Sequence, residues 1–171
     1  MVVRWMVLLL LMTGTNLPAQ EYFKTQYAGV WQRHLDYSEA VAAAMPEVNY
    51  NFRPTEGAMS FQEQLLHIVD NISMLTALIT GNRQEFYQKA EAGEFNKAEV
   101  LQSLTRANAH VLELIHTASD SLLNEEITFR GVPMSKQNIF YLLRDHQAHH
   151  RAQCLVYLRM KGVPAPGYVG W

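Results

Sequence analysis

Four long segments of the chain carry helical periodicity, and no segment carries a strand pattern of comparable strength. Apolar residues recur at every third or fourth position, which is the spacing of one face of an α-helix. The pattern predicts helices over about 21–45, 61–80, 97–119 and 136–161. Helices of this length bury their apolar faces against one another. The sequence therefore predicts an all-α fold, a four-helix bundle.

Residues with special backbone preferences stand where these helices begin and end. Ser60 is followed three residues later by Glu63, the capping-box pattern of a helix N-terminus. Pro46 ends the first predicted helix, and Gly81 ends the second. The stretch I-T-F-R-G-V-P-M at 127–134 predicts a small extended turn before the last helix.

The first residues differ from the rest of the chain. Arg4 supplies a positive charge, residues 6–12 form an unbroken apolar run, and Ala19 is a small residue suited to cleavage. The run is much shorter than the roughly 20 residues that a membrane-spanning helix needs. We therefore expect residues 1–19 to be a secretory signal peptide. The mature domain, 20–171, would be exported to the periplasm or the extracellular space without a stable membrane anchor.

Composition and charge narrow the classes of partner. The chain has 171 residues, 49% of them hydrophobic and 18% charged, which suits one globular domain with a sizeable core. Fourteen basic and sixteen acidic residues give a net charge of −2, so we expect no nucleic-acid partner. Cys154 is the only cysteine, which excludes an intrachain disulfide. The expected partner is a small molecule or an ion.

Three histidines lie close together in the last predicted helix. On a helical wheel, His146 and His150 fall in the centre of the apolar stripe, whereas His149 lies at its edge. Arg144 and Arg151 fall on the opposite side, which predicts a solvent-exposed face there. Imidazoles one helical turn apart can bind one ion together. A metal site is favoured over the alternative, in which each buried ring hydrogen-bonds a side chain, a carbonyl group or water.

A third metal ligand has to come from another helix, and two histidines are candidates. His34 lies within the apolar stripe of the first helix, between Val30 and Tyr37. His67 lies about a third of a turn away from the main stripe of the second helix. Periodicity favours His34, but the residues by themselves leave both candidates open.

Two blocks of sequence resemble the DinB-like (DinB/YfiT) superfamily of proposed metalloenzymes. They are S-F-Q-E-Q-L-L-H at 60–67 and D-H-Q-A-H-H-R-A-Q-C-L-V-Y-L-R at 145–159, and the resemblance extends over about 21–171. It implies a four-helix bundle that binds a divalent metal through one histidine of the second helix and two of the last. Carried over to this sequence, the ligands are His67, His146 and His150. The resemblance thus selects His67 over His34.

Three imidazole ligands leave at least one coordination position for water or substrate. Nitrogen ligands suit a divalent ion, with zinc and nickel as first candidates and iron and manganese as alternatives. Such an ion activates water or holds a thiolate. We therefore expect a metal-dependent hydrolase or a thiol-dependent S-transferase acting on a small molecule. The alternative is a non-catalytic module that binds a small ligand or in which the ion is structural. The resemblance is also compatible with a homodimer.

Overall fold

The computed structural model describes residues 19–89 and 95–169. Its elements, in chain order, are α1 (Ala19–Ala44), the short 3-10 helix η1 (Glu47–Asn49), α2 (Phe61–Thr80), α3 (Lys97–Thr117), α4 (Asp120–Asn124), β1 (Glu126–Phe129), β2 (Val132–Ser135) and α5 (Lys136–Met160). Of the predicted signal peptide, only Ala19 is described, and α1 begins there. Within the described parts of the chain, no helix is long and apolar enough to cross a membrane.

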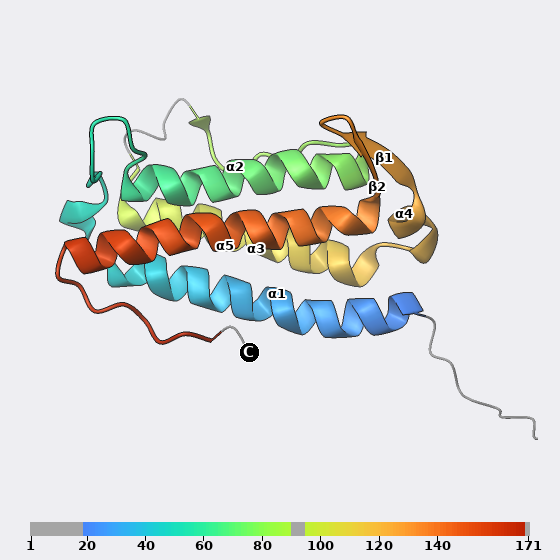
Figure 1. Cartoon of the computed structure of the whole chain (residues 1–171), viewed down its shortest axis with the longest axis horizontal. Helices are drawn as coiled ribbons and strands as arrows, with labels where there is room; N and C mark the ends of the chain where they lie inside the picture. The colour runs from blue at the N-terminus through green and yellow to red at the C-terminus, as the bar shows by residue number, and fades with distance from the viewer. Residues whose placement is uncertain (1–18, 90–94, 170–171) are drawn as a thin grey trace, which may run out of the picture.

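The four long helices α1, α2, α3 and α5 lie side by side along the long axis of the molecule (Figure 1). Both α2 and α1 pack against α3 and α5. The predicted four-helix bundle is therefore confirmed. Its core consists of large apolar side chains from all four helices, among them Trp31, Phe61, Ile72, Leu104 and Phe140. Burial of this apolar surface is the main stabilising contribution to such a bundle.

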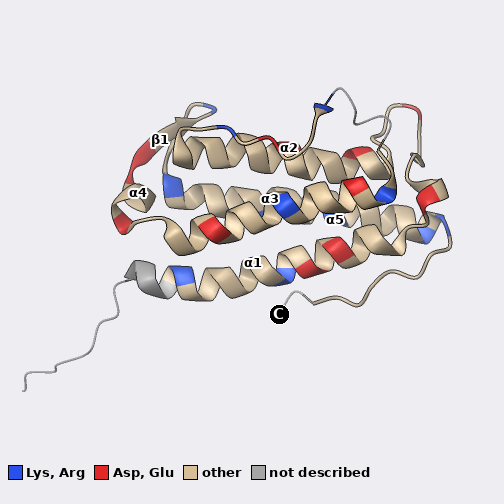
Figure 2. Ribbon diagram, turned by 180° about the vertical axis from the view of Figure 1, so that it is seen from behind, with Lys and Arg blue, Asp and Glu red and all other residues tan. Residues whose placement is uncertain are grey.

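Charged residues lie mainly on the outside of the helices. Figure 2 shows acidic and basic residues interspersed along α1 and α3. One surface ion pair joins α1 to the start of α4, between Lys24 Nζ and Asp120 Oδ1 at 3.0 Å. A partly exposed pair of this kind contributes little to stability, so packing of the core dominates.

Helix α2 begins and ends at the predicted residues. The Ser60 hydroxyl accepts a hydrogen bond from the backbone N–H of Glu63 at 3.2 Å. The Ser60 backbone N–H donates in turn to the Glu63 carboxylate at 2.6 Å, which completes the predicted capping box. At the other end, Gly81 has a φ of 74°, the left-handed conformation that commonly ends a helix. Local signals alone thus place the helix that carries His67.

The segment between α3 and α5 is more structured than predicted. The expected extended turn is an antiparallel hairpin, β1–β2, in which Phe129 pairs with Val132. Arg130 and Gly131 between them have φ values of 50° and 81°, as a two-residue type I′ turn requires. Helix α4, of five residues, was not predicted because it is too short to show helical periodicity. The hairpin lies at the end of the bundle where α2 ends and α5 begins (Figure 1).

Candidate metal centre

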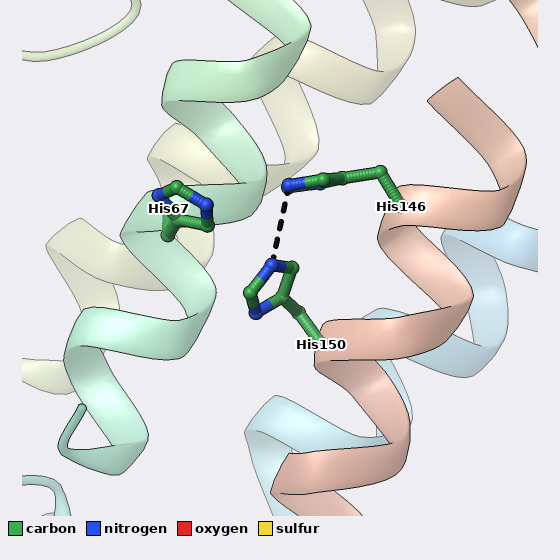
Figure 3. A group of neighbouring side chains, drawn as sticks. All are labelled: His67, His146 and His150. Atoms are coloured by element: carbon green, nitrogen blue, oxygen red, sulfur yellow. Dashed lines mark hydrogen bonds between the residues drawn. The ribbon is translucent and has the colours of Figure 1, made fainter. Parts of the chain in front are cut away.

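His67 of α2 faces His146 and His150 of α5 across the interface between the two helices (Figure 3). One ring nitrogen from each residue can be chosen so that all three lie within 4.8 Å of one another. The ring centroid of His67 lies 5.0 Å from that of His146 and 4.6 Å from that of His150. The fold therefore brings together residues nearly eighty positions apart into a group that could hold a metal ion.

The two histidines of α5 have the spacing that a tetrahedral ion requires. The Nε2 atoms of His146 and His150 are 3.2 Å apart. Two imidazole nitrogens bound to one tetrahedral zinc at ordinary bond lengths would be about 3.3 Å apart. The pair on α5 already has nearly this separation, and His67 supplies a third neutral nitrogen from the facing helix. The donor set therefore fits a divalent transition metal.

A chain of buried hydrogen bonds orients the His150 ring. His150 Nδ1 lies 2.6 Å from the side-chain oxygen of Gln64, an atom that can only accept a hydrogen bond. The Gln64 amide donates to the Tyr157 hydroxyl at 3.3 Å, and Tyr157 donates to the Met59 carbonyl at 2.9 Å. The hydrogen of His150 is thus held on Nδ1, which leaves the Nε2 lone pair directed at His146.

Sequence reasoning did not single out Gln64 or its contact with Tyr157. Tyr157 is only 3% exposed and holds the Gln64 amide in place. The sequence feature that could have identified Gln64 is its position three residues before His67, which puts both side chains on the same side of α2. Spacing of this kind identifies a neighbour, but it does not show which ring on another helix that neighbour contacts.

Burial keeps the two histidines of α5 uncharged. Desolvation, followed by the effects of the nearby imidazoles of His67 and His149, lowers the pKa of His146 to about 4. Desolvation, followed by the effect of His146, lowers the pKa of His150 to about 3. Both rings are therefore neutral at pH 7 and can offer a lone pair, which metal binding requires.

A cavity of about 640 Å³ lies beside the histidine cluster, with His67 and His146 on its wall. Other parts of the wall come from α2, the segment that follows α2, the β1–β2 hairpin and α5. Its apolar lining consists of Met74, Leu75, Phe129 and Leu142. A volume of this size is in the range of small-molecule sites, about 300 to 1,000 Å³. The cluster therefore borders a space that can admit a substrate.

His34, which periodicity favoured as the third ligand, lies elsewhere. Its Nδ1 is 3.2 Å from Nη1 of Arg151, and its ring stacks on that of Trp31 with centroids 6.3 Å apart. The structure brings His67, rather than His34, next to His146 and His150.

The predicted solvent exposure of Arg151 is wrong. The side chain is 8% exposed, and its guanidinium lies over the ring of Tyr37, 4.8 Å from the ring centroid. The reason is that α5 packs against α2 on one side and against α1 on another, so two of its faces are buried. A wheel with one apolar stripe assumes a single buried face. Arg144, on the same predicted face, is half-buried.

Three other residues of the last helix do not join the histidine cluster. His149 is exposed, as its position at the edge of the stripe predicted. Asp145 accepts hydrogen bonds from Nε and Nη2 of Arg144 at 2.9 and 2.8 Å. Cys154 is fully buried, and desolvation raises the pKa of its thiol, so it behaves as a small apolar residue.

Comparison with known proteins gives consistent results. YjoA of Bacillus subtilis is 24% identical over 133 residues, which cover 75% of this chain and 84% of YjoA. The structure of a DinB-like protein from Bacillus cereus superposes with a TM-score of 0.68 at 20% identity, covering 85% of this chain and 95% of that one. YfiT from Bacillus subtilis superposes with a TM-score of 0.65 at 14% identity, and the superposition covers 82% of this chain and 89% of YfiT.

YfiT is described as a "probable metal-dependent hydrolase with an unusual four-helix bundle topology". At these identities the superpositions show a common fold. A sequence model of the DinB superfamily matches residues 30–154, which is most of the chain and includes all three histidines of the cluster. The chain therefore belongs to the DinB superfamily.

Proposed function

We propose that this protein is a divalent-metal-dependent hydrolase of a small molecule, with His67, His146 and His150 as the metal ligands. The observation that carries the proposal is the location of the cluster. Three ring nitrogens lie within 4.8 Å of one another, and two of the three residues form part of the wall of a 640 Å³ cavity. The common fold with YfiT, described as a probable metal-dependent hydrolase, is in keeping with this proposal.

The chain itself would hold the ion and position the substrate. A bound divalent ion supplies a Lewis acid that makes water nucleophilic near neutral pH. The neutral rings of His146 and His150 provide lone pairs at pH 7, and Gln64 holds the His150 ring by its Nδ1 hydrogen. Met74, Leu75 and Leu142 would contact the apolar part of a substrate. We propose zinc or nickel as the metal because all donors are imidazoles.

The alternative is that the ion is structural. Structural zinc sites usually have four protein ligands, whereas open sites have three. Among the described residues, the metal-binding group has three members and borders a cavity. This favours the catalytic proposal. Export through the predicted signal peptide would place the reaction in the periplasm or outside the cell.

The first test is metal analysis of protein purified without a histidine tag, comparing the wild type with His67→Ala and His34→Ala. We expect about one equivalent of divalent metal in the wild type and in His34→Ala, and less than about half an equivalent in His67→Ala. Metal retained in His67→Ala but lost in His34→Ala would refute the ligand assignment.

The second test is turnover. The metal-loaded wild type is assayed on a panel of neutral and anionic esters, amides and phosphate esters, and then on electrophiles with an added low-molecular-weight thiol. Hydrolysis that requires both the metal and His67 would support the proposal. Turnover only with the thiol would indicate S-transfer, and full metal loading without any turnover would favour the binding module.

A further inference from the structure

Among residues 19–89 and 95–169, the side chains around the cavity carry a net positive charge, although the chain as a whole carries a charge of −2. The charged residues of the wall in this part of the chain, with their ion-pair partners, are the cations Arg83, Lys89, Arg130 and Arg144 and the carboxylates Asp70, Glu85 and Asp145. These four cations and three carboxylates give a net charge of +1. A divalent ion held by neutral imidazoles would add two further positive charges, so the field in this space favours an anion.

Both carboxylates on the wall are neutralised by neighbouring side chains. Lys89 Nζ lies 3.1 Å from Oδ2 of Asp70, and the Tyr87 hydroxyl donates to Oδ1 of the same residue at 2.9 Å. Asp145 is paired with Arg144 at 2.8 Å. Neither carboxylate therefore faces the cavity as a free negative charge that would repel an anionic ligand.

The cations of the wall differ in their pairing. Arg83 Nε lies 2.6 Å from a carboxylate oxygen of Glu85, and Lys89 is held by Asp70. Over 19–89 and 95–169, Arg130 has no ion pair; its guanidinium carbon lies 5.5 Å from the ring centroid of Phe129. Arg130 is therefore the wall cation whose guanidinium is available to a ligand.

The backbone at Arg130 supports a functional role for this side chain. Arg130 occupies the first central position of the type I′ turn with a φ of 50°, where asparagine, aspartate or glycine is strongly preferred. A non-glycine residue in this conformation costs stability and is common at ligand sites. The turn brings the Arg130 side chain to the cavity wall, next to Phe129.

We propose that the substrate is a small organic anion whose carboxylate or phosphate binds Arg130 and whose apolar part contacts Phe129, Met74 and Leu142. The planar guanidinium binds either group through two parallel hydrogen bonds. The apolar residues line the same cavity as Arg130 and the two histidines. This inference rests on the proposed function, because the metal centre would act on the molecule that Arg130 holds.

Binding of defined probes tests the proposal. The probes are 4-phenylbutyrate, phenylphosphonate and the uncharged 4-phenylbutanamide, and dissociation constants are measured by ligand-observed NMR on zinc-loaded protein. We expect at least one anion to bind more tightly than the amide. We also expect Arg130→Gln to raise the dissociation constant of that anion about five- to tenfold, which is the loss typical of an exposed charge-assisted hydrogen bond. The dissociation constant of the amide should not change. The preferred anion distinguishes a carboxylate site from a phosphate site.

Arg106→Gln is the matched control, since Arg106 is an exposed arginine of α3 that does not line the cavity. It should leave all three dissociation constants unchanged. The proposal is overturned if no anion binds more tightly than the amide. It is also overturned if Arg130→Gln has no effect, or if Arg106→Gln has the same effect.

Two further measurements separate this proposal from the metal proposal. Zinc content is determined in Arg130→Gln, which should keep its metal because Arg130 is not part of the histidine cluster. Anion binding is also measured in His67→Ala with and without Arg130→Gln. If only the metal proposal fails, His67→Ala contains as much zinc as the wild type, and Arg130→Gln still weakens anion binding in both backgrounds. If only the anion proposal fails, zinc is retained and the effect is absent in both backgrounds.

Discussion

Nδ1 of His150 lies 2.6 Å from the side-chain oxygen of Gln64, so a buried hydrogen bond joins α5 to α2 beside the histidine cluster. The opposite nitrogen of the same ring lies 3.2 Å from Nε2 of His146. The orientation of one candidate ligand is thus set by a neutral amide on the facing helix, and the amide is itself held by Tyr157. This arrangement makes Gln64 a positioning residue for the metal centre.

Gln64→Leu should therefore weaken zinc binding about 10- to 100-fold, the usual effect of removing a residue that orients a metal ligand. Competition with a chromophoric chelator measures the affinity. The matched control is Gln147→Leu, because Gln147 is another buried glutamine that instead donates to Ser38 and Asn108 on the side of α1 and α3. It should lower stability but leave zinc affinity unchanged. Equal losses of affinity in both variants would show a general effect of packing.

Zinc should stabilise the folded protein. A ligand at about 1,000 times its dissociation constant adds about 4 kcal/mol to the free energy of unfolding, which for a chain of this size raises Tm by about 10 °C. Calorimetry with and without a chelator measures the shift. His146→Ala should abolish it, whereas His149→Ala, which removes an exposed neighbour, should retain it. A shift that survives in His146→Ala would place the zinc elsewhere.

The stability of the protein should fall as the pH is lowered from about 6.5 to about 4, in part because of His34. Burial, and then the positive charge of Arg151, lower the pKa of His34 from 6.5 to about 4. In that pH range the unfolded chain binds a proton that the folded ring does not, so stability is full above pH 6.5 and decreases on acidification.

His34→Gln should make this decrease less steep, as measured by urea unfolding at a series of pH values. His116→Gln is the control, because His116 is exposed on α3. It should leave the slope close to that of the wild type. Identical slopes for the wild type and His34→Gln would contradict a contribution from His34.

Arg130→Asn should stabilise the hairpin while weakening anion binding. Asn-Gly is the preferred pair for a type I′ turn, so we expect a gain of about 0.5 kcal/mol in the free energy of unfolding. Gly131→Ala should have the opposite effect, a loss of about 1 kcal/mol, because φ at Gly131 is 81°. Urea denaturation measures both changes. A loss of stability in Arg130→Asn would show that the arginine side chain itself stabilises the turn.

Much of the fold could be predicted because its signals are local. Helical periodicity located the four long helices, and the Ser60 and Glu63 pair with Gly81 placed both ends of α2. Periodicity also placed His146 and His150 on an inner face of α5, where the structure has them beside His67. Helix α4 has only five residues and the strands of the hairpin are also short, so neither shows enough periodicity to be predicted in this way.

The positions of the long helices, and the shared face of His146 and His150 in the last helix, could be read from the sequence because both depend on residues that are neighbours along one helix. Periodicity left His34 and His67 both open, and the family resemblance favoured His67. The three-dimensional structure brings His67 next to His146 and His150, and it reveals that Gln64 contacts His150 and that Arg151 is buried. These facts depend on which neighbours surround each helix. A helix packed on two sides buries two faces, whereas the periodicity of its sequence reveals only the more apolar one.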